Sequence, residues 1–300
     1  MKLRAVIFLV LWTTAYSVLA QGERVSLTTL NCNAFFGGGE TKMQLGQPQT
    51  AADFWRKAQN LVGLWPASPP AFIALEEIGG AREATYLARL AEVRYHHKFQ
   101  PVFAKTKDNY TEEAVGALVD LSQGWGIVGQ PGRDPLLDKV LSKHLVIKLT
   151  NNFTALEICV VHLRRPIGKY ATLEQQDQNA ALKKWTEDRL TKNPRANLVI
   201  LGDFNEFKEL GDASASVAAL LPPDGPLRDA FLQAGGHFET HADGKALDRI
   251  LFSEALRNGD AGLKFEKIFV QEHTHGKGPD RYWFTDHFPV TAVFVPVAKK

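Results

Sequence analysis

The chain has 300 residues, of which 45% are hydrophobic and 23% are charged, an ordinary composition for a soluble globular protein with a sizeable core. Its 35 basic and 33 acidic residues give a formal net charge of +2, and Lys2 and Arg4 account for this surplus. The remainder of the chain is therefore neutral, which excludes the strong overall basic field that many nucleic-acid binders carry.

The first 20 residues are typical of a secretory signal peptide. They begin with basic residues, continue with an apolar run at residues 5–12, and end with small residues at 18–20 before Gln21. A membrane anchor is the alternative, but this apolar run is too short to span a bilayer. We therefore expect cleavage after Ala20, a single domain at 21–300, and a secreted or periplasmic location.

Nine strand-like runs follow the signal segment. In chain order they are Val25–Asn31, Ala71–Glu76, Val115–Leu121, His144–Leu149, Ala155–His162, Asn197–Leu201, Leu247–Phe252, Lys267–Val270 and Pro289–Val295.

Three amphipathic helices are expected between these runs. Thr50 and Asp53 start the first as a capping box, the second covers residues 81–93, and Thr172 and Gln175 form a capping box for the third. Cys32 and Cys159 lie inside strand-like runs, where a buried free thiol is at least as common as a disulfide.

Polar residues stand at the ends of these runs. The C-terminal ends of their runs carry Asn31, Glu77, His162 and Asp203, whereas Asp248 and the pair Asp286-His287 fall at the N-terminal ends of theirs. Because antiparallel neighbours place the end of one strand beside the start of the next, all of these positions can share one edge of a sheet. Carboxylate, amide and imidazole groups gathered at one edge are what metal-assisted phosphoryl hydrolysis requires.

Six motifs in this order resemble the endonuclease/exonuclease/phosphatase superfamily, which has the deoxyribonuclease-I-like fold. They are LNCN at Leu30–Asn33, LEE at Leu75–Glu77, VVHL at Val160–Leu163, LGDFN at Leu201–Asn205, LDRIL at Leu247–Leu251 and TDHFP at Thr285–Pro289. The resemblance implies an α+β fold. It is a four-layer α/β/β/α sandwich of two mixed, largely antiparallel sheets packed face to face, with helices outside.

The resemblance also implies a metal-dependent phosphoric ester hydrolase. Asn31, Glu77 and Asp286 are the implied metal ligands, and the expected ion is Mg²⁺, with Mn²⁺ or Ca²⁺ as alternatives, because hard cations prefer carboxylate and water ligands. Asp203 and Asn205 match the residues that orient the attacking water and the phosphate.

Two histidines complete the implied catalytic set. His287 lies beside the scissile phosphate, and Asp248 fixes its tautomer and favours the imidazolium. His162 donates a hydrogen bond to the phosphate as charge develops in the transition state.

Each position also has a simpler interpretation. Glu76 and Glu77 are neighbours on a strand, so only one can face the cleft, and the motif favours Glu77. Asp203 after a glycine is a common turn former. His162 is by itself compatible with a hydrogen-bonded core histidine, and Asp248 beside Arg249 with a surface ion pair.

Phosphate contacts are expected from four basic residues, Arg164, Arg165, Lys143 and Arg281. Arg164 and Arg165 directly follow the strand that ends at His162, and an arginine fork suits bidentate phosphate binding. Arg281 belongs to the 273–284 loop, which binds substrate if it folds over the cleft and is otherwise a polar surface loop.

The leading prediction is an exported Mg²⁺-dependent nuclease or phosphodiesterase that acts on nucleic acid, works as a monomer and is not inserted in a membrane after signal removal. The alternatives are a phospholipid phosphodiesterase similar to sphingomyelinase C, a sugar or inositol phosphatase, and a non-catalytic binding module. The retained carboxylates and histidines argue against the last of these.

Overall fold

The computed structural model describes residues 23–36, 50–108, 111–207, 216–236, 238–276 and 283–298. The expected signal peptide and Arg281 lie outside these ranges. Within them, no helix has both the length and the apolar character needed to cross a membrane.

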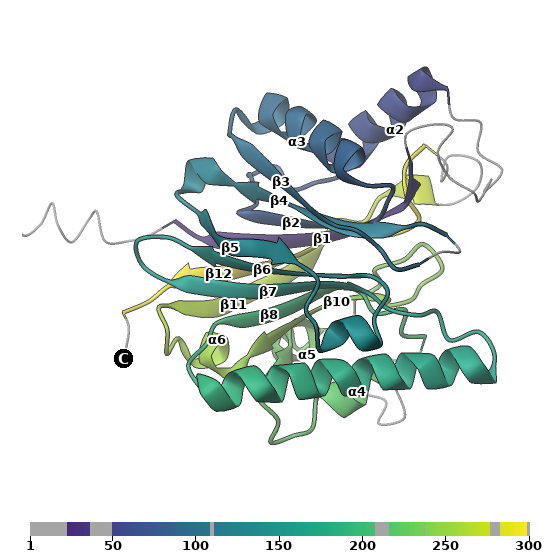
Figure 1. The fold of residues 1–300 in the computed structure, drawn as a ribbon. Coiled ribbons are helices and arrows are strands. Elements are labelled where there is room, and N and C mark those ends of the chain that lie inside the picture. The colour runs from purple at the N-terminus through teal and green to yellow at the C-terminus, as the bar shows by residue number, and fades with distance from the viewer. Residues whose placement is uncertain are drawn as a thin grey trace, which may run out of the picture.

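Two six-stranded sheets form the centre of the fold (Figure 1). In spatial order, the first sheet consists of β11 (Leu263–Val270), β12 (Val290–Pro296), β1 (Val25–Phe35), β2 (Phe72–Ile78), β4 (Ala114–Asp120) and β3 (Phe99–Ala104). The second consists of β5 (Gly126–Gly132), β6 (His144–Thr150), β7 (Ala155–His162), β8 (Leu198–Asp203), β10 (Asp248–Ser253) and β9 (Leu227–Asp229).

Both sheets are mixed and mostly antiparallel, since only β1–β2 and β7–β8 pair in parallel. The α-helices are α2 (Ala51–Gly63), α3 (Ala81–Tyr95), α4 (Lys169–Lys192), α5 (Ala230–Ala234) and α6 (Glu254–Asn258). Short 3₁₀ turns occur at Leu121–Gln123, Leu137–Lys139, Ser216–Leu220 and Thr274–Gly276.

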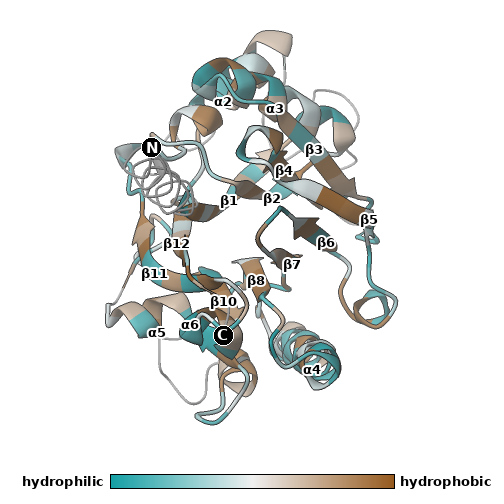
Figure 2. Ribbon diagram, turned by 90° about the vertical axis from the view of Figure 1, so that its left-hand side faces the viewer, coloured by the Kyte–Doolittle hydropathy of each residue, from teal (hydrophilic) through white to brown (hydrophobic). Residues whose placement is uncertain are grey.

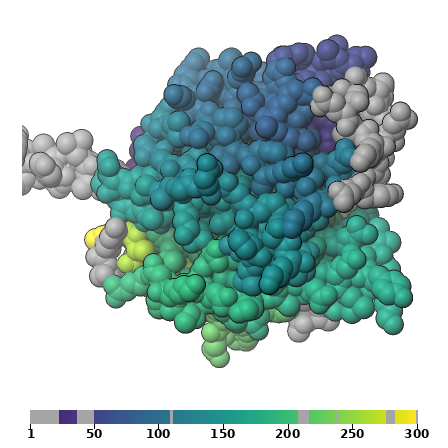
Figure 3. Space-filling model, viewed as in Figure 1, coloured from purple at the N-terminus to yellow at the C-terminus, as the bar shows by residue number. Residues whose placement is uncertain are grey.

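The order of the layers follows from the apolar faces of the strands, which must be covered. Helices α2 and α3 cover the first sheet and α4 covers the second, with strands mostly hydrophobic and α4 mostly hydrophilic (Figure 2). One core cluster fills the space between the sheets, and one more lies under each helical layer. In the space-filling view the blue N-terminal part of the chain lies directly against the teal and green part on the face shown (Figure 3). The expected four-layer sandwich is confirmed.

The two cysteines are separated by this layering. Cys32 is buried under α2 and α3, Cys159 is buried under α4, and both are free thiols.

All nine expected strands are present, but β3, β5 and β9 were not predicted. Strand β3 contains Pro101, and β5 contains glycines and Pro131. Both are edge strands, where a proline is tolerated because its missing N–H faces away from the neighbouring strand. These residues resemble turn formers in sequence, and only the position in the sheet makes them compatible with strands.

The capping box predicted at Thr172 is wrong. Helix α4 begins earlier, at Lys169 after Gly168, and the Thr172 hydroxyl donates to the Gly168 carbonyl at 3.1 Å instead of capping the helix. The capping box at Thr50 and Asp53 is confirmed at the start of α2.

Strand alternation explains why the site lies at one end of the sandwich. In β7, Ile158 and Val160 point into the core between the sheets, so His162, two positions further, continues the same face. In β8 the apolar Leu201 precedes Asp203 in the same way. An even number of positions also separates Asn31, Glu76 and Asp248 from apolar residues of their strands that face the inter-sheet core. The inter-sheet core therefore ends in a polar cluster.

Candidate active site

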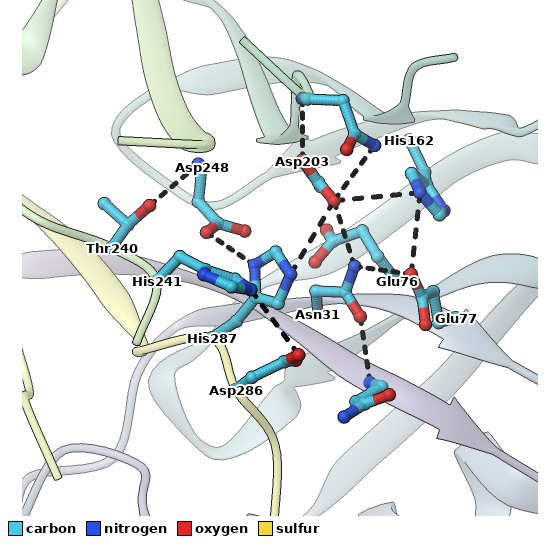
Figure 4. A network of polar contacts seen from close by, with 12 residues as sticks. Asn31, Glu76, Glu77, His162, Asp203, Thr240, His241, Asp248, Asp286 and His287 are labelled. Carbon is cyan, nitrogen blue, oxygen red and sulfur yellow. Dashed lines mark hydrogen bonds and ion pairs between the residues drawn. The ribbon is translucent and has the colours of Figure 1, made fainter. Parts of the chain in front are cut away.

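Asn31 links the two sheets at this polar end (Figure 4). Its Nδ2 donates to Glu77 Oε1 at 2.9 Å in the same sheet and to Asp203 Oδ2 at 3.0 Å in the opposite sheet. The Asn31 side chain is fully buried, so both hydrogen bonds are shielded from water. One amide therefore fixes the separation of two carboxylates that come from different sheets.

Asp203 is the last residue of β8, a central strand of the second sheet. It is opposite His162 across the parallel β7–β8 pairing and opposite Asp248 across the antiparallel β8–β10 pairing. Gly202 makes this packing possible, because a Cβ there would lie 2.0 Å from the Val161 carbonyl oxygen and its φ is +138°. The glycine of the LGDFN motif thus allows β8 to approach β7 and places Asp203 beside His162.

Asp203 carries a perturbed carboxylate. Burial raises the pKa of Asp203 to about 7, although the imidazole of His287 and the Asn205 backbone N–H, which donates to Oδ1 at 2.7 Å, act in the opposite direction. Asn205 also donates through Nδ2 to Asp203 Oδ2 at 3.2 Å and to the Leu163 carbonyl at 3.0 Å. A carboxylate with a pKa near neutrality is suited to exchange a proton with water.

One further side chain holds the segment after β8 in position. Gln175 on α4 donates to the carbonyls of Phe204 and Asn205 at 2.9 Å each. Asn205 has a φ of +50°, and these contacts help to maintain that unusual backbone.

His287 is paired with Asp248. Its Nδ1 lies 2.8 Å from Asp248 Oδ2, and its Nε2 faces Asp203 Oδ2 at 4.0 Å (Figure 4). Burial lowers the pKa of His287, but the charge and hydrogen bond of Asp248 outweigh it and hold the pKa well above its ordinary value. Asp248 is itself positioned because its backbone N–H donates to Thr240 Oγ1 at 3.0 Å.

This pair predicts a pH-dependent stability. Because the pKa of His287 is raised on folding, its contribution is fully present below about pH 6.5, the unfolded value, and is lost as pH rises through the folded pKa. We expect wild type to exceed Asp248→Asn by about 2–3 kcal/mol in unfolding free energy at low pH, and by less at high pH. Urea unfolding with chelator present measures this difference. A difference that is constant or grows with pH would contradict the assignment.

His162 has the opposite protonation preference. Burial, followed by the charges of Lys143 and His287, lowers the pKa of His162 well below its ordinary value. Its Nε2 lies 3.7 Å from both Glu77 Oε1 and Asp203 Oδ2. Two histidines whose pKa values are displaced in opposite directions are typical of a division between a neutral and a cationic role.

Glu77 faces the cavity because its backbone is strained. By alternation it would face the helices, like Leu75, but its φ is +55° and the strand pairing is irregular between Leu75 and Ile78. Its Oε2 accepts the Ala34 N–H at 2.9 Å, and Ala34 also has a positive φ of 54°. Such strain in non-glycine residues is commonly retained at functional sites.

Glu76, the neighbour of Glu77 on β2, lies behind the site. Its side chain is fully buried in the inter-sheet space, and its Oε1 accepts a hydrogen bond from Thr29 Oγ1 at 2.8 Å. Burial, followed by the charge of Asp248, raises the pKa of Glu76 well above its ordinary value. It therefore adds a buried carboxyl group with a raised pKa beneath the site.

The alternative of a surface ion pair between Asp248 and Arg249 is wrong. Arg249 is fully buried on the other face of β10 and pairs with Asp229 at 2.9 Å.

Asp286 has a partner that the sequence did not suggest. His241 Nε2 lies 3.4 Å from Asp286 Oδ2, and the His241 Nδ1 accepts the Asp243 N–H at 3.0 Å, which places the ring proton on Nε2. Burial raises the pKa of Asp286, but the His241 hydrogen bond and the charge of His287 lower it to about 2. The Asp-Gly turn at residues 243–244 was the available signal for this hairpin.

Glu113 was also missed. Its Oε2 accepts from Lys143 Nζ at 2.5 Å, and Asp108 Oδ2 lies 3.0 Å from the same ammonium group. Burial and the charge of Glu77 raise the pKa of Glu113 to about 7. Its position directly before β4 resembles that of Asp248, the first residue of β10, and was the available signal.

Lys57 is a buried cation behind the site. It lies on the apolar stripe of α2 and donates through Nζ to the Asn33 carbonyl. Burial lowers the pKa of Lys57 to about 8, while the charges of Cys32, Glu77 and Asp286 oppose this shift. A lysine within an otherwise apolar helical stripe was the signal for it.

The expected phosphate contacts differ in availability. Arg164, Arg165 and Lys143 line one cavity of about 1570 Å³ together with Asp203 and His287. Arg164 pairs with Glu174 at 3.3 Å and Lys143 is held by two carboxylates, whereas Arg165 lies over the Phe207 ring.

The described part of the 273–284 loop packs beside the site. His273 Nε2 is 3.0 Å from the His287 carbonyl, and His275 stacks on Phe284 at 4.0 Å between ring centroids. Neither histidine lines the cavity that contains Asp203.

The donor set fits a hard divalent cation. Glu77, Glu113 and His162 offer ligand atoms within 4.8 Å of one another, as do His241, Asp286 and His287. Several carboxylates and few thiols favour Mg²⁺, Mn²⁺ or Ca²⁺ over softer metals.

By sequence, no protein-family model and no curated protein matches the chain. Its structure resembles an endonuclease/exonuclease/phosphatase family protein from Bacteroides thetaiotaomicron, with a TM-score of 0.57, 12% identity, and coverage of 93% of this chain and 100% of the other. The chain has the endonuclease/exonuclease/phosphatase fold.

Two further structures share the endonuclease/exonuclease/phosphatase fold. D. rerio TDP2 complexed with a single-strand DNA product has a TM-score of 0.60 and 17% identity, with 91% of this chain and 99% of that chain covered. The human nocturnin catalytic domain with a bound sulfate anion has a TM-score of 0.59 and 16% identity, with 91% and 95% covered. At these identities the likeness establishes the fold, and the proposed chemistry depends on the site.

Proposed function

We propose that this chain is an exported, divalent-cation-dependent hydrolase of phosphate esters, and that its substrate is a nucleic-acid phosphodiester. One observation carries the proposal. The Asp203 carboxylate faces His287 Nε2 at 4.0 Å, while Asn31 joins that carboxylate to Glu77. A base, an imidazolium and an acidic metal ligand thus surround one space at the cavity wall.

In this proposal the cation is held by Glu77 and Asp286, with Asn31 contributing to the same set. A bound divalent cation would neutralise the non-bridging oxygens of the phosphate. Lys57 balances the negative charge of Glu77 and Asp286 from behind.

The remaining residues have roles that follow from their environments. Asp203, with a pKa of about 7, accepts a proton from the attacking water, and Asn205 orients that water and the phosphate. His287 stabilises developing charge as an imidazolium fixed by Asp248. His162, whose pKa is lowered by burial, offers a hydrogen bond to the phosphate.

Nucleic acid is favoured as the substrate by two observations. The TDP2 structure with the same fold holds a single-strand DNA product. The cavity, at about 1570 Å³, exceeds the ~300–1,000 Å³ of typical small-molecule sites and carries basic residues along its walls.

A phospholipid is the second candidate. Ile167, which is 67% exposed, lines the cavity with Arg164 and Arg165, and Tyr170 in the first turn of α4 is 83% exposed. Exposed apolar side chains next to arginines suit contact with a lipid surface.

A substrate panel tests the proposal. Protein lacking residues 1–20 is incubated with single-stranded DNA, RNA, a chromogenic phosphodiester, a phosphomonoester and sphingomyelin, with Mg²⁺ or with EDTA. We expect cleavage of the nucleic acids and the chromogenic diester with Mg²⁺ only. If sphingomyelin is the only compound hydrolysed, the proposed substrate changes from nucleic acid to a phospholipid. Activity that survives full chelation would refute the cation dependence. Sequencing the exported protein tests export, with Gln21 as the expected N-terminus.

A further inference from the structure

Two cations lie over one aromatic ring at the edge of the proposed active site. Lys245 Nζ is 4.4 Å and Arg165 Cζ is 5.4 Å from the centroid of the Phe207 ring. Arg165 follows β7, Phe207 follows β8, and Lys245 precedes β10, so three separate connections converge here. All three residues line the cavity that contains Asp203 and His287.

The two positive charges are uncompensated. In the part of the chain that the structure describes, neither Arg165 nor Lys245 forms an ion pair, in contrast to the neighbouring Arg164, which pairs with Glu174. The aromatic ring offsets only about 0.5–1 kcal/mol for a cation at an exposed site. Arg165 is exposed and Lys245 is half-buried, so an anion in the cavity can reach both. An anion placed there would relieve their mutual repulsion.

The ring already has two cationic partners. Stacking of bases on aromatic side chains is the common alternative at such a site, but at Phe207 a stacked base would compete with Arg165 and Lys245 for the ring. Phe207 therefore acts as a support that holds the cations in place. The chemistry of this cluster suits a phosphate, which accepts hydrogen bonds from a guanidinium and an ammonium group.

We propose that Arg165 and Lys245, supported by Phe207, bind a phosphate of the substrate strand adjacent to the phosphate that is cleaved. This inference rests on the proposed nucleic-acid phosphodiesterase function and adds to it a selection for substrates that carry more than one phosphate. The inner part of the cavity is rich in carboxylates and repels anions beyond the scissile phosphate. A separate cationic subsite therefore determines where the next phosphate lies.

The salt dependence of binding tests the subsite. Fluorescent single-stranded oligodeoxythymidylate is titrated with protein at several salt concentrations in Mg²⁺, in a His287→Gln background so that the strand remains uncut. Each lost phosphate contact lowers the slope of log affinity against log salt by about 0.7 for single strands. Because the two cations bind one phosphate, we expect the Arg165→Gln/Lys245→Gln double variant to lose about 0.7 of slope and to bind at least ~10-fold more weakly at low salt.

Lys267→Gln on the exposed face of β11 is the matched control, because it removes one charge far from the cavity. An unchanged slope in the double variant, or an equal loss of slope per charge in Lys267→Gln, would overturn the subsite. Thermal unfolding of every variant confirms that the fold is intact.

The two proposals fail in different ways. Suppose that wild type hydrolyses the chromogenic diester, but the Arg165→Gln/Lys245→Gln variant shows the same slope of log affinity against log salt as its parent. Only the subsite is then refuted. If wild type hydrolyses no phosphate ester under any condition, the proposed function is refuted whatever the slope.

Discussion

Replacing His287 with glutamine is expected to lower kcat/KM on the chromogenic phosphodiester by ~10²–10⁴-fold. Glutamine keeps a hydrogen-bonding side chain but carries no proton that can be transferred and no positive charge. The structural basis is the 2.8 Å contact to Asp248, which keeps the imidazole charged beside Asp203. Steady-state kinetics across pH measure the loss.

A double-mutant cycle distinguishes catalysis from a general loss of structure. Asp248→Asn alone should also reduce kcat strongly, because the imidazole loses the carboxylate that orients it. The Asp248→Asn/His287→Gln double variant should be little worse than His287→Gln alone, since the two residues act as one unit. Additive losses would indicate that Asp248 and His287 act independently, and near-wild-type activity of either single variant would refute the assigned roles.

Metal removal is expected to abolish turnover and to lower thermal stability. One cavity is lined by Glu77, Glu113, Asp203 and Asp286, and a bound cation would relieve the repulsion between such carboxylates. At a Mg²⁺ concentration of about 100 times Kd, the bound ion stabilises the fold by about 2.7 kcal/mol. For a chain of this size that corresponds to a rise in Tm of about 5–10 °C.

Glu77→Gln should remove most of this Mg²⁺-induced rise in Tm and most of the activity. Glu187→Gln is the matched control, because Glu187 is exposed on α4 and does not line the cavity. Calorimetry with and without Mg²⁺ reads out binding independently of turnover. The ligand assignment would be contradicted if Mg²⁺ did not change the Tm of wild type. It would also be contradicted if Mg²⁺ raised the Tm of Glu77→Gln by the same amount as that of wild type.

Backbone strain gives the same location for the site. Among non-glycine residues of the described chain, positive φ values occur next to the polar cluster at Asn33, Ala34, Glu77 and Asn205, and elsewhere at Glu112 and at His96, which ends α3. Non-glycine residues adopt this conformation at a cost of about 1–3 kcal/mol each. At Glu77 the strain has an identifiable result, because it turns the carboxylate from the helical layer into the cavity.

The sequence by itself determined the central strands and the polar residues at their ends. Strand alternation is local, so an apolar residue at Leu201 predicts that Asp203 shares its inward face. Motif order then indicated the fold. The edge strands β3 and β5 could not be predicted, because their prolines and glycines are compatible with strands only where one side lacks a partner.

Only the tertiary structure decided which side chains meet. His241 contacts Asp286 and Glu113 contacts Lys143 across separations of 45 and 30 positions along the chain, which follow from how the sheets and hairpins pack. The buried position of Lys57 and the two cations over Phe207 have the same origin. Periodicity along a strand is set by the local geometry of the backbone. Contacts between distant segments depend on register and layer packing, which no short pattern specifies.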